Sequence, residues 1–240
     1  MIRLDKYLCE VNIGTRSEVK ELIRKGRITV NGDVCKSPDR KINESETVCL
    51  DGQTVSYAVF HYLMFHKPAG VLTAARDKKQ PTVMDYFRDY PGRDLNPVGR
   101  LDKDTTGLLL ITNDGALSHM LLSPKKHVPK TYEVHLRDPI DPDACKKLEE
   151  GVDISEAEPE PVTAPAKVTV IEDRLIHLTI TEGRFHQVKR MLCAVGNEVT
   201  GLKRLSMGSL ILDEALQEGE YRPLTGEEEA LLLTYRNSQQ

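Results

Sequence analysis

Two aspartates, Asp102 and Asp104, stand in the stretch NPVGRLDKDTTGLLLITNDG, just ahead of a nearly unbroken apolar run. A carboxylate in that position could be a solvated turn residue, a phosphoryl acceptor, a metal ligand or a nucleophile toward another substrate. Aspartates commonly satisfy the backbone groups of turns, so an isolated aspartate would favour the turn. The sequence around the two aspartates therefore has to decide between these roles.

The segment Asp102-Lys103-Asp104-Thr105 matches the D-x-D-x-T pattern of haloacid-dehalogenase-like phosphatases. The nucleophilic aspartate of those enzymes stands where an apolar strand ends, whereas here the apolar run LLLIT follows the aspartates. The reversed order leaves a phosphatase as a remote alternative. A P-loop is excluded, because no G-x-x-x-x-G-K-[ST] sequence occurs.

The composition is that of an ordinary globular protein, with 240 residues, 39% of them hydrophobic and 29% charged. No apolar run approaches the roughly 18 residues of a membrane span, and the N-terminal sequence has no signal-peptide pattern. The five cysteines form no C-x-x-C pair, which favours reduced thiols over a zinc site. The histidines show no ligand-like spacing. We therefore expect a cytoplasmic protein with no metal, no cofactor and no membrane partner.

The net charge is −4, but the charges are segregated along the chain. Residues 14–36 carry six Lys or Arg against three acids, and residues 186–204 carry four against Glu198 alone. Binding to nucleic acid depends on where the charge lies rather than on its total. Local basic faces are therefore compatible with this sequence.

The first 58 residues predict a small domain of their own. Thr15-x-x-Glu18 reads as a capping box that begins a helix with apolar residues on one side, ending near Gly26. Asn31-Gly32, between alternating apolar and polar residues, predicts a β-hairpin. On these residues alone, a capped helix with a solvated charged face would be the simpler interpretation.

Two expected helices, a basic turn and the Asn-Gly hairpin follow one another within about fifty residues. This pattern resembles the S4-type RNA-binding domain. The resemblance implies that the basic side chains of the helix and turn contact folded RNA. The candidates are Arg16, Arg24, Lys25 and Arg27.

Residues 59–240 predict a larger domain, reached through a hinge near 51–60. The expected elements are a strand, a Pro-Ala-Gly turn and another strand over 61–72, a buried strand at 108–112, a short helix through 122, a strand at 130–136, two strands over 165–183 hinged at 172–173, and a helix over 185–196. The Pro- and Glu-rich stretch 153–165 is expected to be a surface connector. Strands outnumber helices without regular alternation, so we expect an α+β fold with a mixed, largely antiparallel sheet flanked by helices.

Five sequence motifs of this larger domain occur together: HKPAGV at 66–71, GRLDKDTTGLLLITNDG at 99–115, KTYEV at 130–134, EGRFHQVKRM at 182–191 and GEYRPLT at 219–225. In this order, behind an S4-like unit, they resemble the RsuA-type pseudouridine synthases over nearly the whole chain. One departure is His66, where that family usually has Asn. The resemblance implies conversion of a uridine in ribosomal RNA to its C-glycoside isomer, without metal or cofactor.

By its match to the GRLD motif, Asp102 would be the catalytic carboxylate. It would either take the anomeric carbon as the base departs or remove a sugar proton to start an elimination. An apolar site would keep water from trapping the open sugar. Asp104 matches a position outside the core of the motif, and we interpret it as a turn residue.

The helix over 185–196 carries two candidate cations. At about 100° per residue, Lys189 lies roughly 110° from the centre of the apolar stripe and Arg190 about 150°. Lys189 would therefore border the core, and Arg190 would point to solvent or phosphate. Lys189 alone would be a solvated flank; the resemblance implies that it pairs with the catalytic aspartate.

Three further residues are assigned through the resemblance. Tyr132 lies on the apolar face of its strand and alone would be a core tyrosine; in the family it would stack on the uracil. Arg100 would help to fill the base stack vacated by the flipped nucleotide, since isomerising a base requires access to both faces of its ring. Arg184, with Arg190, is expected to contact the RNA.

The Thr-Thr-Gly at 105–107 and the segment SPKKHVPKTY are closer to the small-subunit enzymes of the family. We therefore expect the protein to act on 16S ribosomal RNA, free or within an assembly intermediate. We also expect it to be a monomer. Two alternatives are a synthase acting on 23S ribosomal RNA and an assembly factor whose synthase domain has lost activity. The intact set of Asp102, Tyr132 and Lys189 argues against the second alternative.

Overall fold

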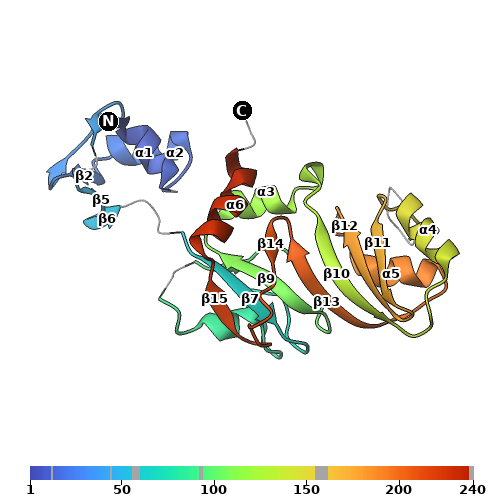
Figure 1. The fold of residues 1–240 in the computed structure, drawn as a ribbon. Coiled ribbons are helices and arrows are strands. Elements are labelled where there is room, and N and C mark those ends of the chain that lie inside the picture. The colour runs from blue at the N-terminus through green and yellow to red at the C-terminus, as the bar shows by residue number, and fades with distance from the viewer. Residues whose placement is uncertain (12, 44, 56–59, 92–93, 155–161, 238–240) are drawn as a thin grey trace. The chain divides into compact units, whose positions relative to one another are not determined.

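The structure is a computed structural model that describes residues 1–11, 13–43, 45–55, 60–91, 94–154 and 162–237. The chain divides into two compact units, residues 1–59 and 60–240 (Figure 1). The boundary expected at 58/59 and most of the expected connector lie outside the described residues. None of the helices in the described ranges is long and apolar enough to cross a membrane.

The N-terminal unit combines two helices with short antiparallel strands. The helices are α1 (Leu4–Glu10) and α2 (Arg16–Arg24). A sheet with the order β3-β2-β5-β6 is formed by β2 (Ile28–Val30), β3 (Asp33–Val34), β5 (Val48–Leu50) and β6 (Gln53–Val55). A separate pair is formed by β1 (Ile2–Arg3) and β4 (Lys41–Ile42).

Both local predictions for this unit are confirmed. The Thr15 backbone N–H donates to a Glu18 carboxylate oxygen at 2.7 Å, and the Glu18 N–H donates back to Thr15 Oγ1 at 3.5 Å, which is a capping box at the start of α2. Asn31 and Gly32 both have positive φ and form the two-residue turn between β2 and β3. Sequence chemistry at these two points therefore fixes where the helix begins and where the hairpin turns.

The second unit is built on one large sheet, which Figure 1 shows with β15 at one edge and β11 at the other. Within the described residues this sheet has the strand order β11-β12-β10-β13-β9-β7-β15, with β14 added to β13 and β8 to β9. Its strands are β7 (Tyr62–Lys67), β8 (Asn96–Pro97), β9 (Thr106–Thr112), β10 (Lys130–Leu136), β11 (Lys167–Glu172), β12 (Leu175–Ile180), β13 (Val199–Met207), β14 (Leu210–Ile211) and β15 (Tyr221–Pro223). The pairing of β9 with β13 is parallel, and the other pairings given for these strands are antiparallel. The predicted α+β fold with a mixed, largely antiparallel sheet is confirmed.

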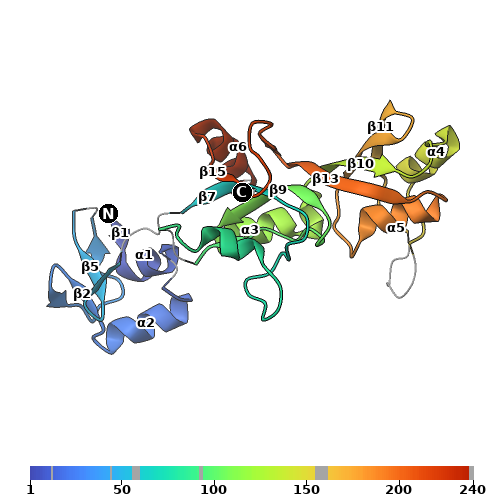
Figure 2. The ribbon, with the colours of Figure 1, turned by 90° about the horizontal axis from the view of Figure 1, so that it is seen from below.

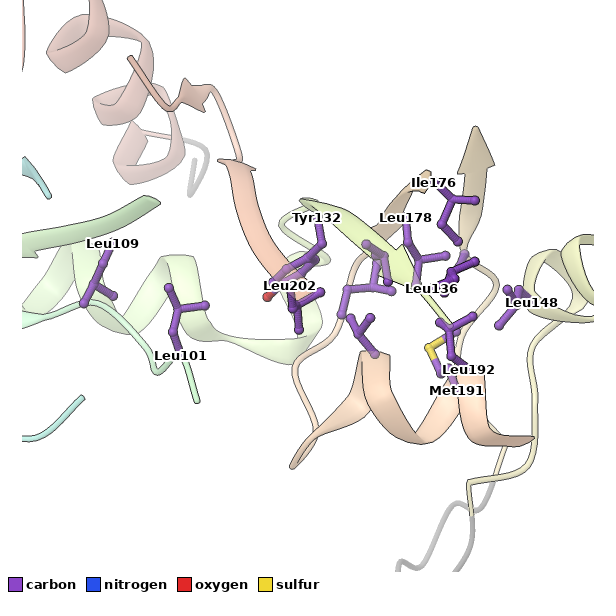
Figure 3. Close-up of a cluster of buried hydrophobic side chains, with 14 of the residues drawn as sticks. Leu101, Leu109, Tyr132, Leu136, Leu148, Ile176, Leu178, Met191, Leu192 and Leu202 are labelled. Atoms are coloured by element: carbon purple, nitrogen blue, oxygen red, sulfur yellow. The ribbon is translucent and has the colours of Figure 1, made fainter. Parts of the chain in front are cut away.

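Helices cover this sheet on both faces. They are η1 (Val83–Phe87), α3 (Gly115–Leu122), η2 (Pro124–Lys126), α4 (Pro142–Glu150), α5 (Gln187–Ala194) and α6 (Gly226–Asn237). Side chains of α3 and α6 pack on one face of β7 and β9, whereas α4, α5 and η1 pack against the cluster on the other face. Figure 3 shows Met191 and Leu192 of α5 directed toward Leu136 and Leu178 of the strands. Figure 2 shows α5 alongside β10 and β13.

The strand predicted after the Pro-Ala-Gly turn does not form. In the segment that follows Gly70, Leu72 forms an isolated bridge with Thr82 instead of a strand. The Gly70 N–H donates to the Lys103 carbonyl at 2.7 Å, so this segment satisfies its backbone against the loop that precedes β9. The other predicted strands, and the helices α3 and α5, are present.

Candidate active site

A pocket of about 420 Å³ opens in the second unit. Its walls come from the loop 99–105 ahead of β9, from β10 and β13, and from the segment 180–189 that leads into α5. Among the described residues, no group of three or more His, Cys, Asp or Glu side chains is arranged to hold a metal ion. The pocket therefore has to be understood from the side chains that line it.

Asp102 lies on the rim of this pocket, in a loop that the chain holds at both ends. The side chain of Thr73 donates to the Leu101 carbonyl at 2.7 Å and accepts from the Leu101 N–H at 3.2 Å. The Thr105 N–H closes the turn on the Asp102 carbonyl at 3.1 Å. The Asp102 side chain is 28% exposed, so it faces the pocket without being sealed from water.

Lys67, at the end of β7, donates hydrogen bonds to the backbone of the same loop. Its side chain is fully buried, and its Nζ donates to the carbonyls of Pro68 at 3.0 Å and Thr105 at 2.9 Å, with Lys103 at 3.4 Å. Burial lowers the pKa of Lys67 to about 8. The lysine of HKPAG was part of the sequence resemblance, but its contact with the Asp102 loop was not predicted.

Replacing Lys67 with Met should therefore destabilise the protein, because three carbonyls lose their donor. A lost partner for a buried polar group costs about 1–3 kcal/mol, so we expect the free energy of unfolding to fall by about 2–4 kcal/mol. Urea denaturation of Lys67→Met measures this change. Lys79→Met, at an exposed lysine, is the matched control and should unfold at nearly the parent's urea concentration. Equal midpoints for both variants would contradict the role of Lys67.

Lys189 of α5 reaches both aspartates but is closer to the second. Its Nζ donates to the two carboxylate oxygens of Asp104 at 2.6 and 2.8 Å, and lies 3.5 Å from Asp102 Oδ2. This hydrogen bond holds the pKa of Asp104 below its usual range. Asp104 lies in the turn, as expected, and its carboxylate also forms an ion pair with Lys189. The turn folds its carboxylate back beside Asp102, although its side chain stays 72% exposed.

His186 is a second side chain near Asp102 that sequence reasoning did not single out. Its Nε2 lies 3.6 Å from Asp102 Oδ1, an ion pair whenever the imidazole is protonated. His186 has a left-handed backbone at the N-cap of α5, and its ring stacks on that of exposed Phe185 at 3.8 Å between centroids. The signal was present within EGRFHQVKRM, but the left-handed conformation that turns the ring toward the pocket is not visible in a sequence.

Tyr132 and its neighbours form the apolar wall. Tyr132 is nearly buried on β10, and Figure 3 shows it beside Leu202 of β13. Leu101 and Val188 line the same pocket. A wall of this kind excludes water from a reacting sugar. The strand predicted for residues 130–136 has alternating buried and more exposed residues, and this alternation turns Tyr132 inward.

The arginines assigned to RNA have different surroundings. Arg100 is exposed at the pocket rim. Arg184 lines the pocket but pairs with Glu182 at 3.1 Å and donates to the Val162 carbonyl at 2.9 Å. Arg190, which we expected to point to solvent or phosphate, is partly buried and donates to the carbonyls of Phe185 and Ile154. The segment ending at Ile154 covers that side of α5, which a helical projection cannot anticipate.

In the N-terminal unit the four predicted RNA contacts are all exposed. Arg16 and Arg24 lie at the two ends of α2. Lys25 pairs with Glu21 at 2.6 Å, and Arg27 pairs with Asp51. Exposed pairs of this kind contribute little to stability, so the charges remain available to a phosphate ligand.

Comparisons with known proteins bear on both units. The RNA pseudouridylate synthase family matches residues 61–194, and the S4 domain matches residues 2–55. Uncharacterized RNA pseudouridine synthase YtzG of Bacillus subtilis is 49% identical over 234 residues, which cover 96% of this chain and 98% of that protein. Ribosomal small subunit pseudouridine synthase A of Haemophilus influenzae is 43% identical over 230 residues, covering 95% of this chain and 97% of that protein.

A solved structure described as a crystal structure of pseudouridylate synthase is 41% identical to this chain, with a TM-score of 0.69. The match covers 97% of this chain and 100% of that one. The similarity thus extends through both units, including the loop of Asp102 and the start of α5. The chain belongs to the RsuA-like RNA pseudouridine synthases, isomerases of uridine in RNA, and its N-terminal unit is an S4 domain.

Proposed function

We propose that this enzyme converts a uridine of 16S ribosomal RNA to pseudouridine, with Asp102 as the catalytic carboxylate. The observation that carries this proposal is the juxtaposition of Asp102 with the Lys189 cation at 3.5 Å and the Tyr132 wall in one pocket. The 16S substrate is supported by the 43% identity to proteins named ribosomal small subunit pseudouridine synthase A.

The chemistry requires the target uridine to leave the base stack and enter the pocket. Asp102 would then either attack C1′ of the ribose or remove its C2′ proton, and in both routes the bond from N1 to C1′ breaks. Tyr132 would stack on the uracil, and Lys189 would pair with the carboxylates, which lie 2.6 Å (Asp104) and 3.5 Å (Asp102) from its Nζ. Arg100, exposed on the rim, would occupy the gap that the flipped nucleotide leaves. His186 joins this set because its ring lies beside Asp102.

The test measures tritium released from C5 of labelled uridine, because C5 exchanges its hydrogen for the bond to C1′. Substrates are 16S and 23S ribosomal RNA, each as naked RNA and within a subunit particle. We expect release from 16S RNA or from the small-subunit particle. Release from 23S RNA alone would replace the proposed substrate, and no release from any substrate would favour an inactive assembly factor.

The S4 domain is proposed to contribute RNA affinity rather than chemistry. Neutralising Arg16 and Arg24 together, each to Gln, should weaken binding and make it less dependent on salt. Each lost phosphate contact should lower the slope of log affinity against log salt by roughly 0.7 to 0.9. The single-turnover rate at saturating RNA should stay near that of the parent. Filter binding over a salt series measures the slope, with Lys167→Gln, an exposed residue of β11, as control.

A further inference from the structure

Three polar side chains line the pocket beside Asp102 and Tyr132 and take no part in the chemistry described so far. They are nearly inaccessible to solvent, with exposed fractions of 1% for Thr105, 2% for Arg204 and 8% for Lys130. Two of them are cations. We call these three residues the pocket floor.

The hydrogen-bonding capacity of the pocket floor is only partly used. The Arg204 Nε donates to the Leu108 carbonyl at 2.7 Å, whereas its buried Nη2 has no partner among the described residues. Thr105 Oγ1 is likewise buried with no partner there. The Lys130 Nζ donates to the Val128 carbonyl at 2.9 Å, which uses one of its three N–H groups. Buried donors of this kind normally have partners, so a ligand is the natural candidate.

The electrostatics point the same way. Burial lowers the pKa of Lys130 to about 8, and the nearby charge of Arg204 acts in the same direction. Within the described part of the chain, no carboxylate forms an ion pair with either cation. Two buried cations without a counter-charge are energetically unfavourable. They are well placed to receive an electron-rich ligand, which would offset that cost.

Strand register places these groups around Tyr132, on which we proposed that the uracil stacks. Tyr132 on β10 is paired with Arg204 on β13, and Lys130 lies two residues before Tyr132, on the same face of β10. Thr105 ends the loop that carries Asp102. Gly107 allows this arrangement, because a Cβ there would lie 2.3 Å from the Arg204 carbonyl oxygen. The pocket floor is therefore built around the strand that presents Tyr132.

The reaction creates an anion at this position. When the bond from N1 to C1′ breaks, its electron pair stays with the uracil, whose negative charge spreads over N1, O2 and O4. The ribose carbon is meanwhile held by Asp102 or, after loss of its C2′ proton to Asp102, as an enol ether. C5 then bonds to C1′, either displacing the Asp102 carboxylate or while Asp102 returns its proton to C2′. C5 loses its own proton and N1 gains one, so atoms and charge balance in both routes. Preorganised donors aimed at developing charge usually make the largest single contribution to catalysis.

We propose that Lys130, Arg204 and Thr105 bind the uracil through its carbonyl oxygens and stabilise the uracil anion while the base is detached. This inference rests on the proposed function, because it takes the pocket of Asp102 as the uracil site. It adds a set of substrate-binding residues whose contribution is electrostatic and separate from that of the carboxylate.

The symmetry of the base explains why such a set would suit an isomerase. Turning uracil by half a turn about its N3–C6 axis exchanges N1 with C5 and O2 with O4. Donors that contact both carbonyl oxygens therefore find an oxygen in each place before and after the turn. The pocket floor would hold the detached base equally well in the starting and the product orientation, so the anion is retained while it rotates.

The test combines Lys130→Met with substrates in which sulfur replaces O2 or O4 of the target uridine. Lys130→Met should lower the single-turnover rate on ordinary RNA about 100-fold, the effect of losing one such donor. Sulfur is a weak acceptor, so each thio-substrate should react more slowly with the parent enzyme. For at least one of the two thio-substrates, Lys130→Met should add little further loss. If Lys130 only supports the fold, the rate loss caused by Lys130→Met and the rate loss caused by the thio-substrate would multiply for both thio-substrates. That result would overturn the proposal.

Two controls distinguish a contact between Lys130 and the base from a contact with the RNA backbone or a general effect of charge. Lys125→Met, at an exposed lysine in the same segment, should keep the parent's rate. If Lys130→Met lowers the salt dependence of RNA binding, the lysine contacts a phosphate and the proposal is wrong. Arg204→Met and Thr105→Val repeat the same measurement, and Thr105→Val preserves shape if the arginine variant does not fold.

Asp102→Asn, measured on the same RNA, distinguishes a failure of this inference from a failure of the proposed function. An active Asp102→Asn variant would remove the assigned site itself. An inactive Asp102→Asn variant together with multiplying effects for Lys130→Met would leave the site in place and remove only the role of the pocket floor.

Discussion

Asp102→Asn is expected to abolish pseudouridine formation while leaving RNA affinity nearly unchanged. The amide keeps the size of the side chain but loses the lone pair that attacks C1′ or takes the C2′ proton. We expect a loss of more than about 10³-fold in the single-turnover rate, since the nucleophile or base has no substitute. Tritium release from C5-labelled uridine measures the rate, and filter binding measures the affinity.

Asp104→Asn is the matched control, because it removes a carboxylate two residues away in the same turn. Lys189 would then lose its closer partner and could pair with Asp102, which lies 3.5 Å from it already. We expect activity within about tenfold of the parent. A dead Asp104 variant beside an active Asp102 variant would reverse our assignment of the two carboxylates.

Lys189→Met should have the second largest effect, because it leaves two neighbouring carboxylates with a methionine where their cation was. Like charges that share a site bind a proton more readily, so the acidic limb of the pH–rate profile should move to higher pH. At neutral pH we expect a loss of roughly 100-fold, part of which returns as the pH rises. A single-turnover pH series measures this shift.

Two further variants on α5 sharpen the test of Lys189. Lys189→Arg keeps a positive charge but places it differently, so an intermediate rate is expected. Arg190→Met removes the adjacent cation, whose contacts are the Phe185 and Ile154 carbonyls, and should lower stability without moving the pH profile. If Lys189→Met is slow but keeps the parent's pH dependence, its ion-pair role is wrong.

Local sequence rules were sufficient for much of the fold. The capping box at Thr15, the Asn31-Gly32 hairpin and the alternation that turns Tyr132 inward depend on residues close together in the chain. The second strand expected after Gly70 did not form, because the backbone of Leu72 pairs instead with Pro81 and Val83, and the Gly70 N–H donates to the Lys103 carbonyl. Backbone pairing between such separate segments leaves no periodic signal in the sequence.

The site was predictable only in part. The motifs named Asp102, Tyr132 and Lys189, and the structure brings all three to one pocket, although their roles remain predictions. The preference of Lys189 for Asp104 depends on how one tight turn folds back. The unpartnered groups of the pocket floor depend on the register between β10 and β13. Contacts decided by turn geometry or strand register are invisible until the chain is folded.

The central claim is that Asp102 in this pocket isomerises a uridine of 16S ribosomal RNA. The most direct measurement maps pseudouridines in the ribosomal RNA of cells that lack this protein, and of the same cells supplied with the parent enzyme or with Asp102→Asn. We expect one pseudouridine of 16S RNA to disappear, to return with the parent enzyme and to stay absent with Asp102→Asn at equal protein levels. Its return with Asp102→Asn, or a loss confined to 23S RNA, would contradict this claim.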